Sequence, residues 1–191
     1  MSGEEAHAKG AEGAQRARTY LELTSRAKVQ WINPHPLAVR KLTFTWADDS
    51  EPFSFDIGGQ LLGEELDGQE FLAECKNYAT SSDLLPHYRK FLAQCYRAYS
   101  LRPERCDNFL FISFAAFGGS VWDTLTSVER VIEAVESRKV AATTSGEVDV
   151  EIRKAVADRL RILILSPWHE RLVLTKEHLG VIRRFDAEKE V

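Results

Sequence analysis

The sequence predicts an α/β protein in which a mixed central β-sheet is flanked by helices. Two nearly continuous apolar runs, 108–117 and 159–168, are typical of strands that are buried on both faces of a sheet. Segments with apolar residues at three- and four-residue spacing precede and separate these runs, and this spacing indicates helices. The region 37–78 combines short alternating stretches with turn signals, which favours antiparallel strands. A hairpin-rich start followed by strand–helix–strand crossovers therefore predicts a mixed sheet with helices on both faces.

The N-terminal part of the chain is expected to form one helix and three strands. The helix carries a modest apolar stripe that includes Leu21, and two prolines in the next segment fix an extended loop. An interruption at Gly58-Gly59 is expected in the second strand, and Asp67-Gly68 is a turn signal before the third. The expected elements are a helix at 12–26, a loop at 31–36, and strands at 37–48, 53–65 and 69–78.

The rest of the chain is expected to alternate between helices and buried strands. The helix after the third strand has the clearest pattern, because its apolar residues repeat at helical spacing from Leu84 to Tyr99. The last helix is expected to be short and to lie over the core. With no internal repeat or low-complexity linker, residues 1–191 are expected to form a single domain. The expected elements are helices at 83–99, 121–139, 148–158 and 174–185, and strands at 108–117 and 159–168.

The composition is that of an ordinary globular protein, since 44% of the residues are hydrophobic and 10% are aromatic. No apolar run approaches the ~20 residues that a transmembrane helix needs, and no apolar stretch follows the charged N-terminus as in a secretory signal. The three cysteines, Cys75, Cys95 and Cys106, show no C-x-x-C spacing, which argues against a disulfide framework or a zinc site. We therefore expect a cytoplasmic protein that does not bind membranes.

The formal net charge of −4 restricts the kinds of partner. A nucleic-acid binder that acts alone usually has a basic balance, because neutralising phosphates supplies most of its affinity. The acidic balance therefore argues against tight, unaided DNA binding, although metal ions can offset the carboxylates of a nuclease. We expect a homodimer, or a partner subunit that helps to hold the substrate.

Candidate site residues lie on the second and third predicted strands. Residues two apart in a strand share a face, so Glu74 and Lys76 lie together, opposite the core face that carries Cys75. Asp56 lies on the matching face of the second strand and can meet Glu74 across the hairpin. The triplet Glu74-Cys75-Lys76 is also the only acidic-x-Lys triplet in the chain.

Two carboxylates and a lysine suit metal-dependent phosphodiester hydrolysis. Mg²⁺ prefers oxygen ligands and keeps several waters, so one or two carboxylates plus a substrate phosphate suffice, and Mn²⁺ is a possible substitute. Asp56 and Glu74 would hold the metal, with the backbone carbonyl of Cys75 as a further ligand. Lys76 would orient the attacking water or help to deprotonate it.

The meeting of Asp56 and Glu74 requires an irregular hairpin. A two-residue turn at Asp67-Gly68 would put Asp56 on the wrong face by one residue and too far along its strand. We therefore expect a longer loop centred near Glu65, or a bulge at the two glycines of the second strand.

The segments FDIGGQLLG and GQEFLAECKNY resemble the core of the PD-(D/E)xK superfamily of restriction-endonuclease-like nucleases, particularly its Mrr-like and archaeal Holliday-junction-resolvase-like branches. The resemblance implies an αβββαβ core over about residues 11–117, with a C-terminal elaboration over about residues 118–191. The helix, three strands, helix and strand predicted above follow this order.

The resemblance also assigns roles to residues. Asp56, Glu74 and Lys76 match the motif aspartate and the E-x-K that bind magnesium and activate water in the superfamily. An acidic residue of the first helix often contributes to the metal site, and Glu12 is the nearest candidate here. Two features depart from the pattern: no proline precedes Asp56, and Gln94 is not followed by a tyrosine four residues later, as in the RecB-like branch.

The function implied by the resemblance is a Mg²⁺-dependent endonuclease that hydrolyses DNA in prokaryotic restriction, antiphage defence or repair. A catalytically inactive fold relative that serves as an interaction or scaffold subunit is one alternative, which the net charge of −4 favours. A nuclease that acts on RNA is the other. Further residues that could follow a phosphate backbone, or simply form a solvated helix face, are Tyr78, Arg89, Lys90 and Arg97.

Overall fold

The structure is a computed structural model that describes residues 3–48, 50–78, 84–138 and 148–189. Its strands are β1 (Ala27–Ile32), β2 (Thr43–Phe44), β3 (Phe53–Ser54), β4 (Ile57–Leu61), β5 (Glu70–Lys76), β6 (Asn108–Ser113) and β7 (Leu160–Ile164). Its α-helices are α1 (Gly3–Thr24), α2 (Pro36–Leu42), α3 (Leu84–Leu101), α4 (Val128–Ser137), α5 (Val150–Arg159), α6 (Pro167–Arg171) and α7 (Lys176–Lys189). Short 3₁₀ turns are η1 (Glu64–Leu66), η2 (Pro103–Arg105) and η3 (Gly119–Thr124).

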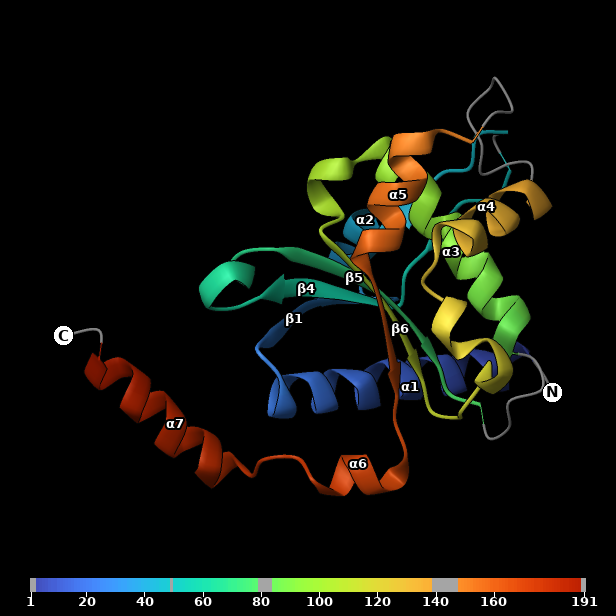
Figure 1. Cartoon of the computed structure of the whole chain (residues 1–191). Coiled ribbons are helices and arrows are strands. Elements are labelled where there is room, and N and C mark those ends of the chain that lie inside the picture. The colour runs from blue at the N-terminus through green and yellow to red at the C-terminus, as the bar shows by residue number, and fades with distance from the viewer. Residues whose placement is uncertain (1–2, 49, 79–83, 139–147, 190–191) are drawn as a thin grey trace.

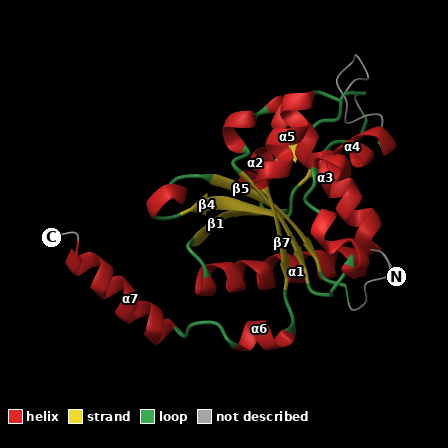
Figure 2. Cartoon of the chain, viewed as in Figure 1, coloured by secondary structure: helices red, strands yellow, loops and turns green. Residues whose placement is uncertain are grey.

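Five strands form one sheet in the order β1-β4-β5-β6-β7, and β2 and β3 form a separate two-stranded sheet. β4 is antiparallel to both of its neighbours, whereas β5, β6 and β7 are parallel. Helices lie on both faces of this sheet, with α1 on one side and α2, α3, α4 and α5 on the other (Figures 1 and 2). The predicted α/β class with a mixed sheet is thus confirmed.

One face of the sheet is covered by α1. Small side chains on the helix, Ala14 and Ala17, allow a close approach to the strand residues Phe71 and Ala73, and all four are almost fully buried. Cys75 lies in the same cluster. The face of β5 that the sequence predicts to be buried is therefore the face beneath α1.

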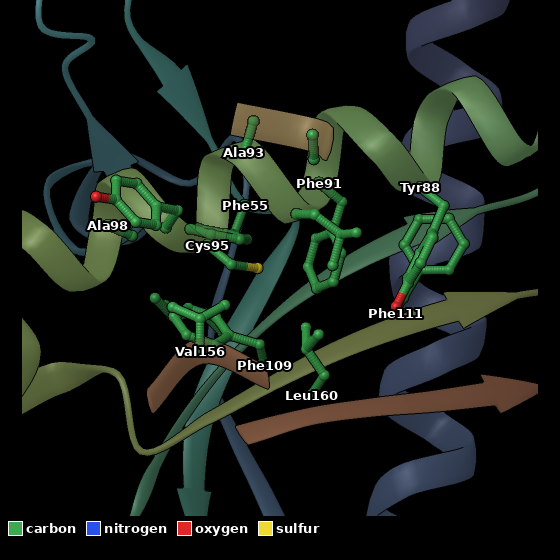
Figure 3. Close-up of a cluster of buried hydrophobic side chains, with 14 of the residues drawn as sticks. Phe55, Tyr88, Phe91, Ala93, Cys95, Ala98, Phe109, Phe111, Val156 and Leu160 are labelled. Carbon is green, nitrogen blue, oxygen red and sulfur yellow. The ribbon is translucent and has the colours of Figure 1, made fainter. Parts of the chain in front are cut away.

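The opposite face carries an aromatic core between the sheet and α3 (Figure 3). Phe91 of α3 lies against Phe55 and Phe111, with ring centroids 6.2 and 5.3 Å apart. Tyr88 lies one turn earlier and meets Phe111 at 5.0 Å, edge to face. Burial of each such ring contributes on the order of 2 kcal/mol, so this layer fixes α3 against the strands that carry the candidate site.

Residues 37–48, which the sequence predicts as a strand, instead form α2 and the short β2. Pro36 occupies the first turn of α2, and the His35 side chain accepts a hydrogen bond from the Leu37 N–H at its start. Ala38 and Leu42, four residues apart, are the buried positions of the helix. The prediction was wrong because the apolar residues of so short a segment fit both the alternation of a strand and the four-residue spacing of a helix.

The expected loop at 31–36 is also only partly correct, because Trp31 and Ile32 close the edge strand β1. The two glycines expected to interrupt the second strand lie inside β4, and the break falls earlier, at Phe55 and Asp56. A Cβ on Gly59 would collide with the Lys28 carbonyl, so close contact with β1 requires glycine there.

Several elements of the C-terminal half are shorter or more exposed than predicted. The expected helix at 121–139 is η3 followed by α4, which the Ser127 side chain caps. β6 is fully buried but ends at Ser113, and β7 is an edge strand in which only Leu160 is buried. The last helix, α7, extends away from the core instead of covering it (Figure 1).

Three predicted helices occur close to their expected positions. α1 begins earlier than expected and ends at Thr24, α3 extends to Leu101, and α5 begins after Asp149, whose side chain caps it. Residue 83, the expected start of the helix that became α3, lies outside the described residues. Among the helices that the structure describes, none has the length and apolar character needed to cross a membrane.

Candidate active site

The β4–β5 hairpin brings Asp56 and Glu74 together. β4 and β5 pair with Ile57 opposite Ala73 and Gln60 opposite Glu70. One step further along this register, Asp56 falls opposite Glu74, and the hairpin is centred on residue 65. The pairing shows no bulge, so the longer loop predicted near Glu65, which contains η1, is the correct alternative.

Asp56 is held at the point where β4 stops pairing as a strand. Its backbone N–H donates to the Ala73 carbonyl at 3.0 Å, and its Oδ2 accepts from the Cys75 N–H at 2.7 Å. The Asp56 carboxylate thus accepts the hydrogen bond that a backbone carbonyl would accept from the Cys75 N–H if the β4–β5 pairing continued. This bond fixes the Asp56 side chain against β5.

Glu74 and Lys76 lie side by side on β5, as strand alternation predicts. Lys76 Nζ is 2.6 Å from Glu74 Oε1, and the two side chains are only 19% and 11% exposed. Glu74 Oε2 is buried, and no hydrogen bond to it is found among the described residues. One oxygen of this carboxylate is therefore paired with the lysine, while the other has no donor in the part of the chain that the structure describes.

Cys75 contributes its backbone, not its thiol. Its side chain is buried beneath α1, and this burial raises the pKa of the thiol well above its ordinary value, so it remains protonated. The N–H and C=O of one strand residue point to the same side of the strand. Because the Cys75 N–H points to Asp56, we infer that its carbonyl also faces the side on which Asp56 lies.

The two carboxylates repel each other in this setting. Burial raises the pKa of Asp56, and the nearby Glu74 raises it further, to about 7. Lys76 and the more distant Lys90 act in the opposite direction, but only partly. For Lys76, burial lowers the pKa, yet the attraction of Glu74 and Asp56 outweighs it and leaves the pKa above its ordinary value.

These properties fit a hard divalent cation. Two carboxylates that repel each other form an oxygen-rich set that a Mg²⁺ ion would neutralise, and one of their oxygens is buried and has no donor among the described residues. Among the described residues there is no group of three or more His, Cys, Asp or Glu side chains that could hold a metal. A site here would therefore depend on two carboxylates, a backbone carbonyl, waters and substrate.

Glu12 is not brought to this cluster. It is exposed on α1, and the face of α1 that packs on the sheet meets the side of β5 opposite to Glu74 and Lys76. Glu12 lies one turn before Arg16, and its negative charge helps to raise the pKa of the Arg16 guanidinium.

Gln94 is a buried polar residue of α3 to which the sequence pattern assigned no role at the site. Its side chain is 3% exposed, and its Oε1 has no hydrogen-bond partner among the described residues. It lies one turn after Lys90 on α3. Lys90 helps to lower the pKa of Asp56, and Glu74 helps to raise the pKa of the Cys95 thiol, so this part of α3 faces the site carboxylates. A polar residue among the apolar residues that repeat at helical spacing along α3 is the sequence signal that could have identified it.

The residues suggested to follow a phosphate backbone have different surroundings. The Tyr78 hydroxyl lies 2.9 Å from His87 Nε2, and the two rings stack. Arg97 donates to the Thr45 carbonyl at 2.8 Å. Arg89 and Lys90 are exposed on α3. Of this set, Lys90 and Tyr78 act electrostatically on the candidate site.

Comparisons with known proteins give little further information. No protein-family model matches the sequence, and no curated protein matches it. Among solved structures, the chain is similar to the Moraxella osloensis Cap4 SAVED/CARF-domain containing receptor, with 11% sequence identity and a TM-score of 0.40. The similarity covers 82% of this chain and 32% of that one, so this chain spans about a third of its length. A likeness of this degree carries no argument about activity.

Proposed function

We propose that this chain is a divalent-metal-dependent endonuclease that hydrolyses phosphodiester bonds in DNA. The observation that carries the proposal is the meeting of Asp56 and Glu74 across the β4–β5 hairpin, with Lys76 Nζ 2.6 Å from Glu74. Two adjacent carboxylates and a lysine in a largely buried cluster are the groups that this chemistry needs. The resemblance of the surrounding segments to PD-(D/E)xK nucleases points to the same reaction, and implies a role in restriction, antiphage defence or repair.

Asp56, Glu74 and the Cys75 carbonyl would hold a Mg²⁺ ion. When bound, the ion supplies positive charge at the scissile phosphate and lowers the pKa of a coordinated water. The Cys75 N–H keeps Asp56 in place, through the 2.7 Å bond to its Oδ2. The hairpin therefore positions both carboxylates before substrate arrives.

Lys76 would act as a cation and hydrogen-bond donor, not as a base. Its pKa is above the ordinary value, because the attraction of two carboxylates outweighs the effect of burial. A protonated ammonium group can orient an attacking water and offset charge on the phosphate. Of the two roles expected from the sequence, orientation of the water is the one that this pKa supports.

The test is cleavage of supercoiled plasmid by the wild type and by Lys76→Ala, each with Mg²⁺, Mn²⁺ and chelator. We expect metal-dependent nicking by the wild type, and a loss of roughly 100-fold or more in the variant. Lys28→Ala is a matched control, because Lys28 is an exposed lysine on the edge strand β1 and should leave the rate unchanged.

Calorimetry with Mn²⁺ separates the nuclease from a scaffold. A nuclease should bind the ion in the wild type and lose that binding in Asp56→Asn, which preserves an acceptor for the Cys75 N–H. A wild type that neither binds metal nor cleaves DNA would refute the proposal and favour the scaffold. Cleavage of single-stranded RNA without cleavage of DNA would keep the chemistry but change the substrate.

A further inference from the structure

The C-terminal arm, residues 166–189, leaves the body of the protein after a few anchoring contacts. Arg16 forms an ion pair with Glu170 of α6, and the Leu174 N–H donates to the Leu23 carbonyl. Beyond Leu174 the chain forms α7, which projects away from the sheet and its covering helices (Figures 1 and 2). Of the described side chains of α7, all except Leu179 and the glycine that follows it are exposed.

α7 has an apolar stripe that the body of its own chain leaves in solvent. Val181 and Ile182 are 67% and 44% exposed, and His178 lies on the same face one turn before them. Arg183 and Lys176 lie on the opposite face. An amphipathic helix with its apolar face exposed to water indicates a surface that another molecule covers.

The charges along this stripe are self-complementary. Glu177 and Arg184 are seven residues apart, so they lie on the same edge of the stripe, two turns from each other. When two copies of such a helix pair antiparallel, this edge of one copy meets the same edge of the other. Glu177 of each copy then lies beside Arg184 of the second copy, which gives two attractive pairs about one twofold axis.

We propose that α7 pairs antiparallel with α7 of a second copy of this chain, and that the C-terminal arm is its homodimer interface. The pairing does not require nuclease activity, so it is independent of the proposed function. It assigns the expected second subunit to a surface outside the candidate active site.

The balance of charge favours a protein occupant over a membrane or a nucleic acid. In the sequence of residues 176–191, cations and anions other than histidine are equal in number: Lys176, Arg183, Arg184 and Lys189 against Glu177, Asp186, Glu188 and Glu190. A helix that binds anionic lipid or phosphate carries an excess of lysine and arginine. Mixed charges around an apolar stripe are instead typical of helix pairing.

The apolar area of the arm is of the size that a dimer needs. Trp168 and Leu172 of the α6 region are 70% and 77% exposed, and they add to Val181 and Ile182. Together these side chains expose on the order of a few hundred Å² of apolar surface, the size of patch that marks an interaction site. Each arm, with the polar edges of its stripe, therefore supplies a large part of the roughly 800 Å² per partner of a stable interface.

The test is the molar mass in solution, measured by light scattering during gel filtration. We expect the wild type to have the mass of two chains, and Ile182→Arg to have the mass of one. Arg184→Glu should weaken the dimer by roughly tenfold or more, because Glu177 then faces a like charge. The double variant Glu177→Arg/Arg184→Glu reverses both charges and should restore the dimer.

Arg183→Glu is the matched control, because it makes the same change on the opposite face of α7 and should remain dimeric. Circular dichroism verifies that each variant keeps its helices, which is expected because the substituted side chains are exposed. A monomeric wild type would overturn the proposal, and so would an Ile182→Arg variant that stays dimeric. Failure of the double variant to recover the dimer lost in Arg184→Glu would overturn the antiparallel arrangement.

Discussion

At Asp56, two effects raise the pKa of one carboxyl group together. Burial disfavours the charged form, and the neighbouring Glu74 carboxylate repels it, so the pKa reaches about 7 instead of the ordinary 3.8. Lys76 offsets this only in part. The metal-free protein therefore retains a proton at Asp56 that the unfolded chain releases at much lower pH.

This difference predicts how stability depends on pH in the presence of chelator. Between about pH 4 and pH 7 the folded state binds the proton and the unfolded state does not, so the free energy of unfolding should fall as pH rises. The slope should be at most about 1.4 kcal/mol per pH unit. Urea unfolding at several pH values measures it.

Two variants and added Mg²⁺ test whether Asp56 causes this fall in the free energy of unfolding. Asp56→Asn should remove the fall, and Asp123→Asn, at an exposed position of η3, should leave it in place. Added Mg²⁺ should flatten the curve in the wild type, because the cation stabilises the ionised carboxylates. An equal slope in the wild type and in Asp56→Asn would contradict the assigned pKa.

At the scale of elements, contact between β1 and β4 depends on a missing side chain. Gly59 lies in β4 opposite Val29, and a Cβ there would collide with the Lys28 carbonyl. Any shift that relieves this collision moves β4, which leads directly from Asp56. Packing at the strand edge and geometry at the candidate site are therefore coupled.

Gly59→Ala should destabilise the protein by about 3 kcal/mol, because backbone atoms cannot move aside as a flexible side chain can. Gly10→Ala is the matched control. A Cβ at Gly10 meets nothing within 4 Å, and alanine in a helix should stabilise α1 by roughly 0.5–1 kcal/mol. Thermal or urea unfolding measures both. Equal effects of the two substitutions would refute this account of Gly59.

Arg16 joins three elements next to the site. Its guanidinium donates two hydrogen bonds to Glu170 of α6, at 2.8 and 2.7 Å, and a third to Asn77 Oδ1 at 2.7 Å. It also lies 4.0 Å from the centre of the Phe114 ring. Since Asn77 follows Lys76 directly, this one side chain connects α1 and the C-terminal arm to the end of β5.

Arg16→Met should therefore cost about 1–2 kcal/mol of stability and expose the arm near residue 170 to faster proteolysis. Arg18→Met removes an ion pair of the i,i+4 type with a half-exposed partner and should cost no more than about 0.5 kcal/mol. Unfolding and limited trypsin digestion measure the two effects. Identical digestion of wild type and Arg16→Met would show that Arg16 does not anchor α6.

For the whole molecule, the order of the strands in the sheet determines which strands lose their hydrogen bonds last during unfolding. β5 and β6 are central and almost fully buried, whereas β1 and β7 are edge strands. Amides of β5 and β6 should exchange with deuterium most slowly, at rates that report global unfolding, and those of β7 should exchange faster. Exchange of β5 as fast as that of β7 would mean that the candidate site lies on a locally unstable element.

Features that depend on local periodicity could be predicted from the amino-acid sequence alone. The largely apolar segment 108–113, the helical spacing of 84–99 and the alternation in 70–76 each have one plausible structure, and the structure has it. The juxtaposition of Glu74 and Lys76 follows from strand geometry alone. The need for an irregular hairpin followed from parity, because an aspartate and a glutamate can share a face only in certain registers, and of the two alternatives the structure has the longer loop near Glu65.

Features that depend on contacts between distant segments could not be predicted from local patterns. α2 and β1 lie where short patterns fit more than one element, and packing selected between them. The position of Glu12 depends on which face α1 covers, and the burial of Gln94 depends on how α3 docks. α7 has the same amphipathic pattern whether it covers its own core or projects from it, because periodicity identifies an apolar face but not the surface that the face meets.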